Sequence, residues 1–140
     1  MILFFISACI NETVRYRRVD LTGTLSSEDM QSPMYVSAHH AWYDTDLLAH
    51  PAAMFDQEIF NPGDFSWTID IPIPETFTEG LLIYVWQDTD NDEVFCGLNG
   101  DEEYSDMAYI DDETLFQINV QLTPQHACLA PEILYANFFE

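Results

Sequence analysis

The part of the sequence best suited to bind a ligand is an acidic run, Asp88-Thr89-Asp90-Asn91-Asp92-Glu93-Val94. Carboxylates recur there at every second residue, so a tight loop can turn three of them toward one point. Calcium takes about six to eight oxygen ligands, and an EF-hand loop supplies them from positions 1, 3 and 5 and from the backbone carbonyl at position 7. The corresponding ligands here are Asp88, Asp90, Asp92 and the carbonyl of Val94.

This run departs from an EF-hand loop at two positions. Glu93 stands where glycine usually makes the sharp turn, and Asn99 stands where a bidentate glutamate is expected. A ligand from further along the chain must therefore complete the site, and Asp101 is the first candidate. Three other acids are the alternatives to it: Glu102, Glu103 and Asp106.

The acidic run predicts a bound Ca²⁺ ion, because so many neighbouring carboxylates repel one another unless a cation lies between them. Magnesium is less suitable, since it usually keeps several waters and takes few protein ligands. The alternative is a solvated acidic loop that binds no metal and only protects a strand edge from aggregation.

The charge of the whole chain is strongly negative. The sequence contains 25 Asp and Glu residues but only three basic residues, Arg15, Arg17 and Arg18, for a net charge of −22. Nucleic acid is excluded as a partner, because phosphate binding requires Lys or Arg. Anionic lipid is excluded as an electrostatic partner for the same reason. A divalent cation suits this balance.

The N-terminal residues indicate export. The chain begins MILFFISACI, and Ile6-Ser7-Ala8-Cys9 resembles the lipobox of bacterial lipoproteins. This resemblance implies that residues 1–8 are a truncated signal peptide, that Cys9 is lipidated, and that residues 9–14 link the anchor to one domain at 15–140. The membrane is then contacted only through the lipid. The alternative is an ordinary core strand in residues 2–10.

If Cys9 carries a lipid, Cys96 and Cys128 remain as a pair. An exported domain is expected to oxidise such a pair to a disulfide. The alternative is two unconnected buried thiols.

Several segments of the chain have the pattern of β-strands. Apolar and polar residues alternate in 65–71 and in 116–122, as in strands with one buried face, whereas 81–86 is apolar throughout, as in a central strand. Weaker strand patterns occur at 16–25, 34–43, 54–60 and 133–139. With no long amphipathic helix between them, these segments predict an all-β fold: one antiparallel Greek-key sandwich of about seven strands.

The order of these segments resembles a known family. Leu21-Thr22-Gly23-Thr24-Leu25 is followed by Pro33 to Val36, by Pro62-Gly63-Asp64-Phe65-Ser66-Trp67, and by the 80–86 segment that leads into Asp88. Together they resemble bacterial prealbumin-like (transthyretin-like) β-sandwich domains. The resemblance implies a seven-stranded sandwich with a binding or structural role, and an immunoglobulin-like arrangement is the alternative.

The sequence lacks the Gly-rich phosphate loop, the Gly-x-Ser-x-Gly elbow and the His-Glu-x-x-His helix motif, so we expect no enzyme activity. The predicted function is that of a cell-envelope lipoprotein, at the outer membrane or cell surface, with a calcium-stabilised binding or structural domain. A protein or glycan partner is left open. The alternatives are a carbohydrate-binding module that uses its aromatic residues, a filament or assembly subunit, and a hydrolase that uses the acids between Asp88 and Asp106.

Overall fold

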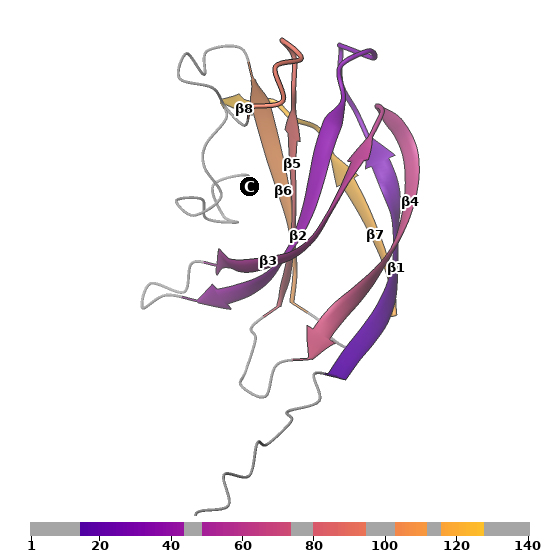
Figure 1. Cartoon of the computed structure of the whole chain (residues 1–140), viewed down its shortest axis with the longest axis vertical. Helices are drawn as coiled ribbons and strands as arrows, with labels where there is room; N and C mark the ends of the chain where they lie inside the picture. The colour runs from indigo at the N-terminus through magenta and orange to yellow at the C-terminus, as the bar shows by residue number, and fades with distance from the viewer. Residues whose placement is uncertain (1–14, 44–48, 74–79, 95–102, 112–115, 128–140) are drawn as a thin grey trace, which may run out of the picture.

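The computed structural model describes residues 15–43, 49–73, 80–94, 103–111 and 116–127, which form strands and their connections and contain no helix (Figure 1). The strands in chain order are β1 (Arg15–Leu25), β2 (Met34–Tyr43), β3 (Ala49–Phe60), β4 (Gly63–Ile73), β5 (Leu81–Gln87), β6 (Tyr104–Ile110), β7 (Gln117–Leu122) and the two-residue β8 (His126–Ala127).

These strands form two sheets that pack face to face. One sheet has the order β4-β1-β7 and the other has the order β3-β2-β5-β6-β8 (Figure 1). The predicted all-β sandwich of about seven strands is therefore confirmed. One pair departs from the expected antiparallel arrangement: β7 runs parallel to β1, from Asp20 opposite Gln117 to Leu25 opposite Leu122. This pairing arises because the chain crosses from β6 to the other sheet and enters it alongside β1 in the same direction.

The core lies between the sheets and follows the alternation read from the sequence. In β4 the residues Phe65, Trp67, Ile69 and Ile71 are all buried. In β7 the buried residues are Ile118, Val120 and Leu122, whereas Phe116 lies before the strand and is 67% exposed. The prediction that Phe116 belongs to the buried face is wrong, because the strand begins one residue later.

Strand β5 is buried on both faces, as its continuous apolar sequence predicts. Its residues Leu81, Ile83 and Val85 pack in the core between the sheets. Its alternate residues Leu82, Tyr84 and Trp86 belong to a second cluster, which includes Met107 of β6. Strand β5 is therefore held on two sides, and the residues at its end are placed by this packing.

Two strands differ from the sequence expectations. Strand β3 begins at Ala49, five residues before the weak pattern at 54–60, and its pairing with β2 is irregular between Ala38 and Ala41. An irregular pairing interrupts the alternation of side chains, so the pattern is lost there. Strand β6 has no apolar alternation, because Asp106 interrupts it. The weak pattern at 133–139 lies outside the described residues.

The close approach of β1 and β7 depends on Gly23. A Cβ atom at Gly23 would collide with the backbone carbonyl of Val120 and would touch the ring of Phe65. We expect Gly23→Ala to lower the free energy of unfolding by about 1–3 kcal/mol or more, because the backbone must move apart to admit the methyl group. Urea unfolding measures the effect. The control is Ser66→Ala at an exposed position of β4, which should change stability little; equal effects of both variants would contradict this steric explanation.

Candidate metal centre

The register between β5 and β6 places two acids at one end of this strand pair. The last paired residues are Gln87 of β5 and Tyr104 of β6. Asp88 follows Gln87 and Glu103 precedes Tyr104, so both acids lie just beyond this pair. Successive residues of a strand point to opposite faces. Asp88 and Glu103 therefore lie on the face opposite to Gln87 and Tyr104. Both acids are buried: Asp88 is 1% exposed and Glu103 is 5% exposed.

The end of β5 is tied to the segment that precedes β2. The buried side-chain amide of Gln87 donates to the carbonyl oxygens of Asp29, at 2.8 Å, and of Ser32, at 3.3 Å. Its oxygen accepts a hydrogen bond of 2.6 Å from the Ser27 hydroxyl. The backbone N–H of Asp88 donates to the carbonyl of Pro33 at 3.1 Å. These bonds fix the point at which the acidic loop begins.

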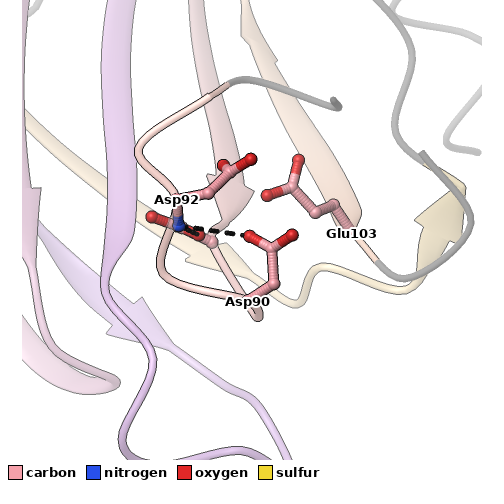
Figure 2. A group of neighbouring side chains, drawn as sticks. Asp90, Asp92 and Glu103 are labelled. Atoms are coloured by element: carbon pink, nitrogen blue, oxygen red, sulfur yellow. Dashed lines mark hydrogen bonds between the residues drawn. The ribbon is translucent and has the colours of Figure 1, made fainter. Parts of the chain in front are cut away.

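The acidic loop winds around the side chain of Asp88. The backbone N–H groups of Asp92 and Glu93 donate to its two carboxylate oxygens at 3.2 Å and 3.1 Å. The N–H of Asp92 also donates to Asp90 at 3.2 Å (Figure 2). The N–H of Val94 donates to Asp92 at 2.7 Å. Each of these bonds joins a carboxylate to a residue two to five positions later, so the loop is tight.

Two residues of the loop adopt a left-handed backbone conformation. Asn91 has φ 58° and Glu93 has φ 60°. Glu93 is the residue at the position where an EF-hand loop has glycine, so the sharp turn is present although the glycine is not. A glutamate in this region costs about 1–2 kcal/mol. The hydrogen bond from Glu93 N–H to Asp88 offsets part of that cost.

Four carboxylates gather as a result: Asp88, Asp90, Asp92 and Glu103 each offer an oxygen, and these oxygens all lie within 4.8 Å of one another. Figure 2 shows three of the four: Asp90, Asp92 and Glu103. Oxygens bound to calcium lie about 2.3–2.6 Å from the ion, so two ligands on opposite sides of it are about 4.6–5.2 Å apart. The four oxygens are therefore spaced closely enough to surround a single cation.

No arginine can neutralise this cluster. The three arginines lie in the first four residues of β1, at the opposite end of the molecule from the end of β5 (Figure 1). Arg18 is paired there with Asp70, with 3.0 Å between Nε and Oδ1. Loss of hydration raises the pKa of Asp90, and the charges of Asp92 and Asp88 add to this effect. The electrostatic environment of the cluster therefore favours the binding of a cation.

An aromatic pair lies beside the acidic loop. The rings of Tyr35 and Trp86 are stacked, with centroids 4.3 Å apart and planes inclined by 10°. Burial raises the pKa of the Tyr35 hydroxyl, and the charges of Glu93 and Asp88 raise it further. The negative charge of the loop thus affects the ionisation of Tyr35, a residue of the neighbouring strand β2.

The structure brings together part of the predicted site. Asp88, Asp90 and Asp92 converge, and the N–H of Val94 bonds to Asp92, which places its backbone in the same loop. Asp101 and Glu102, and the cysteines Cys9, Cys96 and Cys128, lie outside the described residues. Among the alternatives to Asp101, Glu103 joins the cluster. The sequence ranks Glu103 below Asp101 because β6, whose register carries Glu103 to Asp88, lacks an alternating apolar pattern.

Asp106, the last of those alternatives, has another role. Its carboxylate accepts hydrogen bonds from the N–H of Met107 at 2.8 Å and from the N–H of Thr123 at 2.6 Å. It therefore fastens the chain after β7 to β6. Burial raises its pKa, although both hydrogen bonds oppose this shift.

Comparison of the chain with protein-family models, with curated proteins and with solved structures gives no match. The resemblance to prealbumin-like domains therefore stays a prediction. Among the described residues no helix is long and apolar enough to cross a membrane.

Two acids of the cluster should respond differently to replacement when no metal is present. In EDTA we expect Asp88→Ala to lower the free energy of unfolding by about 1–3 kcal/mol, because it removes the acceptor of the Glu93 N–H and one of the two acceptors of the Asp92 N–H. Asp90→Ala should leave stability unchanged or raise it, since it removes an exposed charge from a repelling group. Urea unfolding in EDTA compares them. Equal losses in both variants would show that Asp88 does not organise the loop.

The surroundings of Asp106 and Asp70 shift the pKa values of these two carboxyl groups in opposite directions from the usual value of 3.8. The pKa of Asp106 should be higher in the folded protein than in the unfolded chain. Its contribution to the free energy of unfolding is therefore present at pH values below the unfolded pKa, and it is lost as the pH rises through the folded pKa. Asp70 should titrate below the usual value because Arg18 donates hydrogen bonds to it, so its contribution is lost as pH falls through the folded pKa.

Carboxyl ¹³C NMR measures both pKa values in one sample. Arg18→Gln should raise the pKa of Asp70 and leave that of Asp106 unchanged, since the two groups lie in different sheets. A pKa of Asp106 below the usual value would contradict the burial argument.

Proposed function

We propose that this chain is an exported, non-enzymatic β-sandwich whose acidic loop binds one Ca²⁺ ion and is stabilised by it. The observation that carries the proposal is the convergence of four carboxylates, two of them buried, at the junction of β5 and β6. In this account the ion joins the end of β5 to the start of β6, and so completes a binding or structural domain.

The number and kind of ligands favour calcium. Asp88, Asp90, Asp92 and Glu103 supply four carboxylates, and the backbone carbonyl of Val94 is the expected fifth ligand. Waters or bidentate contacts can raise this number to the six to eight oxygens, approximately, that calcium takes. All these ligands are hard oxygen donors, which suits calcium better than zinc or copper.

Burial explains why binding should stabilise the fold. A buried carboxylate is costly unless it is paired, and Asp88 and Glu103 are buried together in a region of like charge. A divalent ion replaces their mutual repulsion with attraction. Because the unfolded chain does not preserve this geometry, the binding free energy is added to the free energy of unfolding.

The hydrogen bonds of the acids support a structural role for the loop. Both oxygens of Asp88 accept backbone N–H groups, and so do both oxygens of Asp106. A general acid or nucleophile needs an oxygen directed at a substrate. These two carboxylates instead hold the chain in place, which favours a binding or structural domain over the hydrolase alternative.

The proposed location is the cell envelope, with a lipid on Cys9 as the only membrane contact and a disulfide between Cys96 and Cys128. The lipobox-like Ile6-Ser7-Ala8-Cys9 supports it, as does the net charge of −22. Calcium sites in extracellular modules commonly have dissociation constants of about 10⁻⁴–10⁻³ M, which fits an exposed loop with two solvent-facing aspartates.

Thermal unfolding tests the cation site. At a hundredfold excess over the dissociation constant, Ca²⁺ should add about 2.7 kcal/mol and raise the melting temperature by roughly 10 °C relative to EDTA. Asp90→Ala and Glu103→Gln should each abolish most of this rise. Glu103→Gln keeps the shape of the side chain, so its effect isolates the charge.

The controls separate binding from screening. Mg²⁺ at the same ionic strength should raise the melting temperature much less, and Asp64→Asn, an exposed acid of β4 in the other sheet, should respond to Ca²⁺ like the unmodified chain. An equal rise with both ions, or the same calcium response in Asp90→Ala, would show that the loop is only a charged surface.

A further inference from the structure

A cavity of about 540 Å³ lies on the other side of the strand pair that carries the acidic cluster. Its lining comes from the segment after β1, from the end of β5, from the first residue of β6 and from the chain between β7 and β8. Among the lining residues are Ser27, Asp29, Thr89, Tyr104, Thr123 and Gln125. Its size falls within the range of about 300–1,000 Å³ typical of small-molecule sites.

The lining is rich in groups that form hydrogen bonds with hydroxyls. Ser27, Thr89 and Thr123 bring hydroxyl groups, and Gln125 brings an amide. No Lys or Arg lines the cavity, so nothing there attracts a phosphate or a carboxylate. Tyr104 is 43% exposed, and its aromatic ring has an apolar face and a polar tip.

The acids of the cavity are poorly disposed to hold a cationic ligand. One oxygen of Asp29 accepts the N–H of Gln31 at 2.9 Å and that of Ser32 at 3.3 Å, and the other oxygen accepts the Ser32 hydroxyl. Its carboxylate is thus occupied within its own turn. Glu28 is the remaining acid in the lining, and it is exposed to solvent. A neutral ligand with many hydroxyls suits these walls better than a cation.

The walls are held in position before any ligand arrives. The buried side chain of Gln87, one of the lining residues, bonds to Ser27, to the carbonyl of Asp29 and to that of Ser32. Asp106 holds the N–H of Thr123 at 2.6 Å, which fixes another wall. A prearranged site loses less conformational entropy on binding than a mobile one.

We propose that this cavity binds a neutral saccharide, whose ring lies on Tyr104 and whose hydroxyls bond to Thr89 and Thr123. A saccharide hydroxyl can also donate to the Ser27 oxygen, whose own hydrogen is given to Gln87. The proposal goes beyond cation binding, although its dependence on calcium rests on the proposed function. Gln87 and Tyr104 are paired across the strands; Asp88 directly follows Gln87, and Glu103 directly precedes Tyr104. An ion that joins those acids therefore adds a further restraint between the end of β5, which leads to Thr89, and the start of β6, which carries Tyr104. By linkage, calcium and saccharide each strengthen the binding of the other.

The test is an NMR titration of the ¹⁵N-labelled chain with neutral trisaccharides, an α-glucan, a β-glucan and a mannan, at millimolar concentrations in Ca²⁺. At least one should shift the backbone amides of Ser27, Thr89 and Thr123. Tyr104→Ala should weaken this binding about tenfold. The matched control is Tyr16→Ala, a tyrosine that is 61% exposed at the start of β1 and should bind unchanged.

Calcium removal separates the two proposals. EDTA should weaken saccharide binding at least about fivefold, and Asp90→Ala in Ca²⁺ should do the same. Saccharide binding that depends on Tyr104 but ignores EDTA would support the cavity and overturn the coupling. A calcium-induced rise in melting temperature without saccharide binding would support only the ion site. The saccharide proposal is overturned if none of the three sugars shifts those amides, or if Tyr104→Ala binds as well as the unmodified chain.

Discussion

The organisation of the described site depends on the cost of holding two carboxylates out of water. Asp88 and Glu103 are both buried at the junction of β5 and β6, and Asp90 and Asp92 add two further negative charges within 4.8 Å. Buried charge of one sign is unfavourable unless something of the opposite sign approaches it. With all three arginines at the far end of β1, the chain offers no Lys or Arg for this purpose, whereas the spacing of the four carboxylates can accommodate a metal ion.

The rest of the fold explains why these acids cannot simply move apart. Strand β5 is buried on both faces, so its end cannot rotate without disturbing two apolar clusters. Gln87 points to one side and is bound to the segment before β2, and Asp88 points to the other side and is wrapped by the acidic loop. Packing thus fixes the position of the charge, and the loop fixes its orientation. The acidic cluster and the cavity beside Tyr104 are neighbours because Asp88 belongs to the cluster and Gln87, the residue before it, lines the cavity.

Much of this could be predicted from the sequence where local pattern and tertiary environment agree. The alternation of apolar and polar residues in 65–71 identified β4, because one face of that strand is buried and the other is exposed to solvent. The spacing of Asp88, Asp90 and Asp92 identified the loop because its geometry is set by neighbours in the chain. Glu103 could only be ranked among alternatives, since its approach to Asp88 depends on the register of β6, a strand whose pattern Asp106 interrupts. The parallel pairing of β7 with β1 also depends on the global path of the chain, which no local pattern encodes.

The most direct test of the central claim is terbium luminescence, because Tb³⁺ replaces Ca²⁺ at oxygen-rich sites and emits when a nearby aromatic ring is excited. The stacked Tyr35 and Trp86 lie beside the acidic loop and provide that donor. We predict sensitised emission that saturates at one ion per chain, that Ca²⁺ displaces, and that Glu103→Gln loses. Emission that is absent, or that remains unchanged in Glu103→Gln, would contradict the claim that β5 and β6 are joined through a cation.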